Sequence, residues 1–148
     1  IDLLLERSLR DELDHLHQLL RDAKRDNTDF DPGGDLERRV ARITIDLKAL
    51  EITELRILCS VSGGANPGPE SSIMKLSATR LEQDINELSV DVLGYTGFVM
   101  NPVAGGNPVR ADYISSVVPR YLNNRAASIF GGSQEIQRNI IAKMVLGL

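Results

Sequence analysis

Residues 120–148 read RYLNNRAASIFGGSQEIQRNIIAKMVLGL, a stretch in which one helix breaks at two adjacent glycines and another begins directly after them. Gly131 and Gly132 free the backbone from the usual restriction on φ, and Ser133 is a preferred N-cap residue. The first turn of the following helix presents free N–H groups and the positive end of a helix dipole, which suits phosphate, pyrophosphate or an electron-rich ring. Residues 131–135, the glycine corner, are therefore the first candidate for a functional site.

The helix after this corner has one apolar side. Its large apolar residues recur every four positions, at Ile136, Ile140, Met144 and Leu148. Such spacing predicts a helix that is buried along that side.

Three earlier segments show the same helical periodicity. Their apolar positions are Leu5, Leu9, Leu13, Leu16, Leu20 and Ala23; then Leu36, Val40, Ile43, Leu47, Leu50 and Ile57; then Met74, Ala78, Leu81, Ile85, Leu88 and Val92. No segment alternates apolar and polar residues in the way a strand does. The sequence predicts an all-α fold, an antiparallel four-helix bundle that forms a single domain over residues 1–148.

Capping residues suggest where the helices begin and end. Asp35 is the expected cap of the second helix, Gly94 the stop of the third, and Pro119 the first turn of a fourth that ends near Phe130. Residues 94–111 are expected to be irregular. Glu54 falls on the apolar stripe of the second helix, where it is either a functional acid or, more often, a carboxylate that reaches water or an arginine.

Composition excludes several classes of function. A net charge of -4 with 4% aromatic residues and no Trp argues against binding nucleic acid. No apolar segment is long enough to span a membrane. The single cysteine, Cys59, excludes a disulfide framework and a cysteine metal site, and His15 and His17 are two positions apart on a helix, so no metal site is expected. A reducing cytoplasm is the expected location.

Two segments resemble a known family. The sequence ASIFGGSQEIQRNIIAKMVLGL, residues 127–148, is similar to the C-terminal end of acyl-CoA dehydrogenases, and residues 71–98, SSIMKLSATRLEQDINELSVDVLGYTGF, follow that family's looser pattern. The resemblance implies a helical bundle that follows an N-terminal helical domain and a middle β-domain. Because Ile1 is not Met and lies in an uncapped helical stripe, we expect the chain to be a fragment that lacks both domains.

The resemblance also implies an activity. The family removes hydrogens from the α and β carbons of an acyl-CoA thioester: a carboxylate takes the α-proton, and the flavin of FAD takes the β-hydrogen as hydride. The implied partners are an acyl-CoA substrate, an electron-transfer flavoprotein as electron acceptor, and further copies of the chain or a sister subunit.

Site residues carry over position by position. Gly131 stands where many members have the catalytic glutamate, so the resemblance implies that only its backbone N–H acts, with Gly132, on the thioester. Glu6, in an "ER" pair, is a weak alternative base. The remaining positions that match cofactor contacts, either to the same FAD or to the FAD of a neighbouring subunit, are Ser133, Gln134, Glu135, Asp91, Gly94 and Tyr95.

Departures from the family pattern leave other interpretations open. Asp91 would repel a pyrophosphate and Tyr95 adds bulk where the backbone of relatives approaches the cofactor. The chain could therefore be a non-catalytic scaffold subunit of a heteromeric acyl-CoA dehydrogenase. A helical interaction domain with no ligand is the third alternative.

Overall fold

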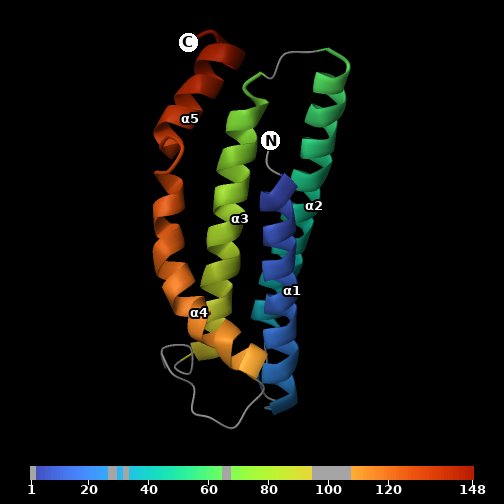
Figure 1. Cartoon of the computed structure of the whole chain (residues 1–148), viewed down its shortest axis with the longest axis vertical. Coiled ribbons are helices and arrows are strands. Elements are labelled where there is room, and N and C mark those ends of the chain that lie inside the picture. The colour runs from blue at the N-terminus through green and yellow to red at the C-terminus, as the bar shows by residue number, and fades with distance from the viewer. Residues whose placement is uncertain (1–2, 27–29, 32–33, 65–67, 95–107) are drawn as a thin grey trace.

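The computed structural model describes residues 3–26, 30–31, 34–64, 68–94 and 108–148; for residues 3–6 and 108–113 it describes the backbone alone. All the regular elements in these ranges are helical (Figure 1). They are α1 (Leu3–Asp26), α2 (Asp35–Ser62), α3 (Glu70–Leu93), α4 (Pro108–Asn124), the 3-10 turn η2 (Arg125–Ser128), α5 (Gln134–Ile141) and the π-helical turn η3 (Ala142–Leu146).

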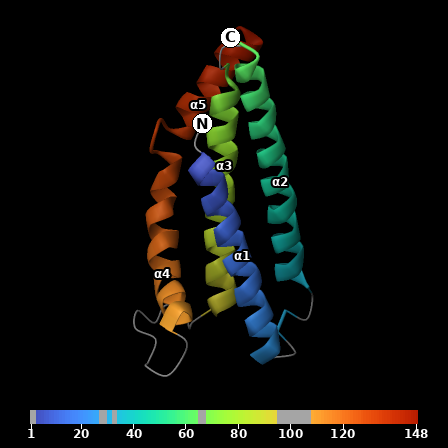
Figure 2. The ribbon, with the colours of Figure 1, turned by 45° about the vertical axis from the view of Figure 1, so that its right-hand side comes forward.

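Helix α3 lies at the centre of the bundle. It packs against α1, α2, α4 and α5, and the two views place it between α2 on one flank and α4 on the other (Figures 1 and 2). Helices α1 and α3 run in one direction, and α2 and α4 run in the other (Figure 1). The all-α antiparallel bundle is thus confirmed, with the short α5 added to the four long helices.

The predicted stripes form the core. Leu9, Leu16, Ile85 and Leu88 are the largest fully buried side chains, and the cluster around them takes residues from α1, α2 and α3. Burial of such side chains is worth about 1.5–3 kcal/mol each, so the three stripes supply most of the force that assembles the bundle. Helical spacing alone identified this core correctly.

The central helix α3 also carries a buried polar stripe, which the sequence pattern did not reveal. Ser72, Thr79 and Asn86 are buried and recur every seven residues along α3. Asn86 Nδ2 donates to the carboxylate of Glu12 in α1, and Ser89 Oγ donates to its own helix. Among the described residues, every buried side-chain polar atom has a hydrogen-bond partner.

The fourth helix begins earlier than expected. Pro108, not Pro119, occupies its first position, where a missing N–H costs nothing, and Pro119 lies inside the helix with its ring exposed. The helix ends at Asn124, and η2 carries the chain on to Ser128. Residues 108–111, which were predicted to be irregular, are therefore helical, and residues 95–107 lie outside the described part of the chain.

The residue that caps α2 is Asp31, not Asp35 as predicted. Asp35 is the first helical residue, and the carboxylate of Asp31 accepts the N–H groups of Asp35, Leu36 and Glu37 at 2.8, 3.2 and 3.2 Å. Desolvation raises the pKa of Asp31, but these three backbone donors outweigh it and leave the pKa below its ordinary value. Asp31 adopts a φ of 57°, a conformation that aspartate tolerates better than most residues.

The stripe after the glycine corner is exposed, contrary to expectation. Ile136, Ile140, Met144 and Leu148 are 52%, 36%, 60% and 81% exposed. Helix α5 contacts α3, and Gln137 and Ile141, on another side of the helix, are half-buried. The periodicity correctly identified an apolar side but not which side this bundle covers.

Two absences concern the described residues only. None of their helices has the length and apolar character needed to cross a bilayer. No group of three or more histidine, cysteine, aspartate or glutamate side chains is arranged there to hold a metal ion.

Candidate functional site at the glycine corner

The glycine corner joins η2 to α5 through two residues in the left-handed region. Gly131 has φ 64° and Gly132 has φ 95°, conformations that L side chains rarely adopt. The N–H groups of Ile129 and Phe130 both bond to Ala126 O and close the preceding turn. The glycine pair is therefore required by the backbone itself.

The predicted N-cap is correctly placed but does not bond as expected. Ser133 is extended, with φ −63° and ψ 162°, and its carbonyl accepts the N–H of Gln137 at 3.0 Å. Its side chain makes no capping bond to the backbone of α5. A hydrogen bond with Ser133 instead lowers the pKa of the Glu135 carboxyl. The Ser133 hydroxyl thus does not cap α5, and the Glu135 carboxylate accepts its own backbone N–H in the first turn.

Side chains hold the corner from the bundle side. Lys75 Nζ of α3 donates to Ala127 O at 3.2 Å and to Gly132 O at 3.0 Å. Gln137 Nε2 donates to Gly131 O at 3.0 Å. The carbonyls of both glycines are therefore fixed by side-chain donors.

The opposite side of the corner is open. Gly131 is exposed, and among the described residues no atom beyond its chain neighbours lies within 4 Å of the place a Cβ would occupy. Gly132 differs, because a Cβ there would lie 2.8 Å from Gln137 Nε2. Gln134 lines a neighbouring cavity of about 310 Å³ together with Arg138 of α5 and Arg80 of α3, among others. Gly131 thus leaves room on the exposed side of the corner.

The other predicted cofactor contacts lie at the far end of α3. Asp91 is in its last turn and Gly94 follows it, with φ 52°; Tyr95 lies outside the described residues. Asp91 and Lys75 are sixteen residues apart on one helix, which corresponds to about 24 Å. The two predicted halves of the cofactor site therefore lie far apart within one chain. A single flavin ring cannot contact both halves of the same chain at close range.

Asp91 has a counter-charge that the sequence did not indicate. Arg39 Nη1 of α2 donates to Asp91 Oδ2 at 2.7 Å, and Glu87 lies 3.9 Å from the same guanidinium. Arg125 binds Glu87 from the other side at 2.9 Å. The two arginines balance the two carboxylates, so the repulsion expected between Asp91 and a phosphate group is offset.

A second polar cluster links α1, α3 and α4. Arg120 Nη1 donates to Glu12 Oε1 at 3.1 Å, and Asn124 Nδ2 donates to Glu82 Oε1 at 2.9 Å. Burial raises the pKa of Glu12, although Arg120 and the bond from Asn86 lower it. Burial, and then the negative charge of Glu12, raise the pKa of Glu82. These residues line a cavity of about 450 Å³ with His15 and Asp11.

Two further candidate residues from the sequence, Glu54 and Glu6, lie in α2 and α1. Glu54 is buried, with 3% exposed, and it has an interaction partner; of the alternatives predicted for it, burial excludes only that it reaches water. Glu6 lies in α1, but its side chain is outside the described part.

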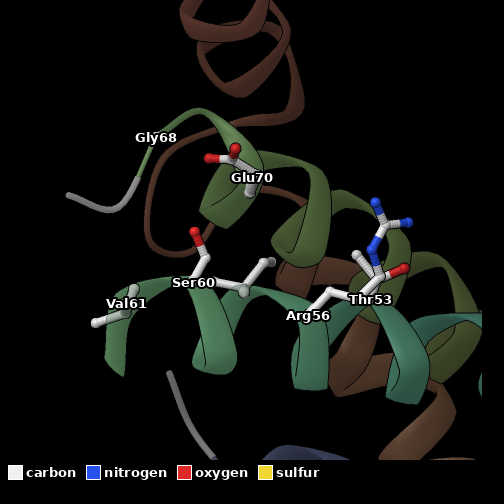
Figure 3. Close-up of a pocket in the computed structure, with 7 residues that line it drawn as sticks. Thr53, Arg56, Ser60, Val61, Gly68 and Glu70 are labelled. Atoms are coloured by element: carbon white, nitrogen blue, oxygen red, sulfur yellow. The ribbon is translucent and has the colours of Figure 1, made fainter. Parts of the chain in front are cut away.

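A further cavity of about 330 Å³ lies at the junction of α2 and α3, where Arg56, Ser60 and Glu70 extend from the two helices (Figure 3). None of the predicted site residues lines it.

The polar residues on α3 were missed, although a signal for them exists. Lys75, Glu82 and Ser89 recur every seven residues along α3, and so do Ser72, Thr79 and Asn86. Polar residues that repeat along a central helix indicate side-chain hydrogen bonds to neighbouring helices. Periodicity could therefore have identified the stripe, but not the carbonyls that Lys75 bonds.

The fold and the corner define an all-helical bundle domain with a glycine turn before its last helix. Residues 6–146 match the family model described as acyl-CoA dehydrogenase, C-terminal domain. The chain therefore belongs to the acyl-CoA dehydrogenase family.

Individual relatives agree with this assignment. The chain is 33% identical over 114 residues to acyl-CoA dehydrogenase IpdE1 of Mycobacterium tuberculosis, an alignment that covers 76% of this chain and 26% of that protein. It is 31% identical over 121 residues to acyl-CoA dehydrogenase FadE34 of the same organism, covering 78% and 15%. The chain thus spans about a quarter or less of the length of these relatives.

A solved structure shares the fold. The steroid ACAD Tcur3481-Tcur3483 superposes with a TM-score of 0.65 over 90% of this chain and 34% of that chain, at 20% sequence identity. This likeness concerns the helical arrangement alone.

Proposed function

We propose that the chain is the C-terminal domain of an FAD-dependent acyl-CoA dehydrogenase that oxidises an acyl-CoA thioester between its α and β carbons. One observation carries the proposal: side-chain donors from α3 and α5 hold the carbonyls of Gly132 and Gly131, and open space remains beside Gly131. That space, beside the positive end of the α5 helix dipole, fits a planar, electron-rich ligand. Family membership supports it independently.

FAD, when bound, would accept the β-hydrogen of the substrate as hydride. The residues that would hold it on this chain are Ser133, Gln134 and Glu135 at the start of α5. In an oligomer, Asp91 and Gly94 would face the cofactor of a neighbouring subunit, because they lie about 24 Å along α3 from Lys75 and the corner. Tyr95 belongs to the same proposed contact.

Gly131 would supply a hydrogen-bond donor rather than a base. Loss of the α-proton places negative charge on the thioester oxygen, and a fixed N–H stabilises that charge. Gly131 has no carboxylate, so the proton must pass to a base at another position. Gly132 would lie against the same thioester.

The exposed apolar stripe supports assembly with another polypeptide. Ile136, Met144 and Leu148 expose large apolar surfaces on one side of α5 and η3, and Ile45, Ile52 and Leu55 do so on α2. Such surfaces are typical of protein contacts. We infer an oligomer of this chain or a complex with a sister subunit, with an electron-transfer flavoprotein as the electron acceptor and the cytoplasm as its location.

A scaffold subunit is the second candidate function. It is favoured by glycine at the position where the resemblance implies the family's base, and by the solved neighbour, the steroid ACAD Tcur3481-Tcur3483, whose name joins two designations. Purification of the complete protein separates the two. If the chain binds the flavin, the protein alone is yellow and its colour bleaches when an acyl-CoA is added; if it is a scaffold, colour appears only with the sister subunit.

The donor role of Gly131 has a direct test. Proline cannot adopt φ 64°, but glycolic acid at position 131 replaces the N–H with an ester oxygen and keeps the backbone free. We expect turnover of the complete protein to fall by about 10²–10³, the usual effect of losing one such donor, while FAD stays bound. The control is the same exchange at Gly64, which also has a positive φ of 90° and is not among the proposed site residues. Unchanged turnover after the exchange at position 131 would refute the role.

A further inference from the structure

Lys75 bonds two carbonyls that flank the glycine turn. Its Nζ lies 3.2 Å from Ala127 O in η2 and 3.0 Å from Gly132 O, and the side chain is half-buried between α3 and the corner. The two carbonyls are five residues apart, on either side of the bend. A single ammonium group therefore joins the start and the end of the turn.

The bond to Gly132 O has a consequence for the next amide. In a trans peptide the C=O of one residue and the N–H of the following residue point in opposite directions. Lys75 pulls Gly132 O toward α3, so the N–H of Ser133 is directed away from α3. By the same geometry, the bond from Gln137 to Gly131 O directs the N–H of Gly132 away from Gln137.

The charge of Lys75 acts in the same direction as this geometry. A lysine ammonium is a compact positive charge, and here it lies beside the N-terminus of α5, the positive end of that helix dipole. The two effects add to the positive potential on the open side of the corner. They favour a ligand that becomes more negative when it is reduced.

We propose that Lys75 is a positioning residue for the glycine corner, which aims the Ser133 amide at the bound flavin and raises the flavin's tendency to accept electrons. The inference rests on the proposed function, because it needs a flavin at this corner. Lys75 does not touch the reacting atoms in this proposal. It acts through the backbone it holds and through its charge.

The test compares three variants of the complete flavoprotein, isolated with a sister subunit if one is required. Lys75→Met removes the charge and both bonds, and Lys75→Arg keeps the charge and the donors. Gln83→Met is the matched control, because Gln83 Nε2 also reaches from α3 to two carbonyls, at Asn124 and Arg125, but away from the glycines. The readouts are the visible flavin spectrum and the fraction of flavin reduced at equilibrium with a reference dye.

In K75M we expect a shifted flavin band and roughly five-fold less reduced flavin relative to oxidised flavin at the same dye setting, the effect of about 1 kcal/mol of lost charge interaction. K75R should restore most of both signals. Q83M should lower the thermal midpoint without moving either. If K75M does not fold, Lys75→Gln, which keeps a donor without the charge, should show the same loss of reduced flavin.

The outcomes separate this inference from the proposed function. A wild-type protein that is colourless alone and with every sister subunit contradicts the proposed function. A yellow, bleachable wild type whose flavin signals are unchanged in K75M, or equally changed in Q83M, overturns the role of Lys75 and leaves the proposed function standing.

Discussion

Arg120 of α4 donates to Glu12 of α1 at 3.1 Å across 108 residues of sequence, and this ion pair ties the fourth helix to the first. The Glu12 side chain is 12% exposed and that of Arg120 is 35% exposed, so the carboxylate depends on a neighbouring cation. The pair defines one side of the polar cluster that also contains Glu82.

Removing Arg120 should destabilise the protein in a pH-dependent way. Arg120→Met leaves a desolvated carboxylate at Glu12, and we expect a loss of about 1–3 kcal/mol at neutral pH, less than for a fully buried pair. Burial already raises the pKa of Glu12 above 4.5, and losing Arg120 raises it further. The loss should therefore be small below pH 4.5 and grow as the pH rises through the folded-state pKa. Thermal unfolding at several pH values measures it. The double variant with Glu12→Gln should recover most of the neutral-pH loss; a loss independent of pH would contradict this account.

Glu82 should cost the folded protein stability when it is ionised. Its pKa is raised by burial and by Glu12, so the folded state holds the proton more strongly than the unfolded state. Such a group stabilises the fold below its unfolded pKa, and that contribution disappears as the pH rises through its folded pKa. Glu82→Gln keeps an acceptor for Asn124 and should stabilise the protein by roughly 0.5–1 kcal/mol at pH 8, with little effect at pH 4. Melting curves of the wild type and of Glu82→Gln at pH 4 and pH 8 measure this stabilisation. A stabilisation that is larger at pH 4 would contradict the raised pKa of Glu82.

The fold was largely predictable because local periodicity is enough to specify it. Leu9, Leu16, Ile85 and Leu88 were placed in the core from helical spacing, and all are buried. Spacing reports that a helix has an apolar side. It does not indicate which element covers that side, so the prediction that the stripe beginning at Ile136 is buried was wrong.

Three details of helix capping and of the corner could not be predicted from the sequence, because they depend on exact backbone geometry or on partners distant in sequence. The Ser133 hydroxyl bonds Glu135 rather than the backbone, and Asp31 rather than Asp35 caps α2, because the choice between neighbouring acceptors depends on exact backbone geometry. Lys75 could not be assigned because its partners are backbone carbonyls more than fifty residues away. Motif resemblance located the corner but did not indicate how it is held.

The capping role of Asp31 can be measured directly. Asp31→Ala removes the acceptor of three N–H groups and also disfavours φ 57°, so we expect it to lower the midpoint of denaturant unfolding. Because the pKa of Asp31 is lowered, its contribution is present above 3.8 and is lost as the pH falls through the folded value. Asp31→Asn, which tolerates the conformation and keeps one acceptor, should lose less. Denaturant unfolding gives these differences, and an equal loss in Asp35→Ala would return the cap to Asp35.

The two glycines of the corner should differ in their tolerance of alanine. In Gly131→Ala the new methyl group enters open space, and the cost is the left-handed backbone, about 1–2 kcal/mol. In Gly132→Ala the methyl group must also displace Gln137 from its bond to Gly131 O, at a φ of 95°. We expect Gly132→Ala to lower the thermal midpoint of the apoprotein more than Gly131→Ala. The reverse order would show that space beside Gly131 is restricted in the assembled protein.

Arg39 should be needed for cofactor affinity because it neutralises Asp91. If Asp91 faces the FAD of a neighbouring subunit, Arg39→Met leaves an uncompensated carboxylate near the cofactor's phosphates, and FAD affinity should fall by roughly three- to ten-fold at low salt. The effect should shrink as ionic strength rises, since both side chains are partly exposed.

Adding Asp91→Asn to Arg39→Met removes the repelling charge and should restore FAD affinity. Arg42→Met, which breaks an exposed ion pair elsewhere on α2, should not change FAD affinity. Titration of the apoprotein with FAD, followed by flavin fluorescence, measures all four proteins. Equal affinity of Arg39→Met and the double variant would show that Asp91 does not act on the cofactor through its charge.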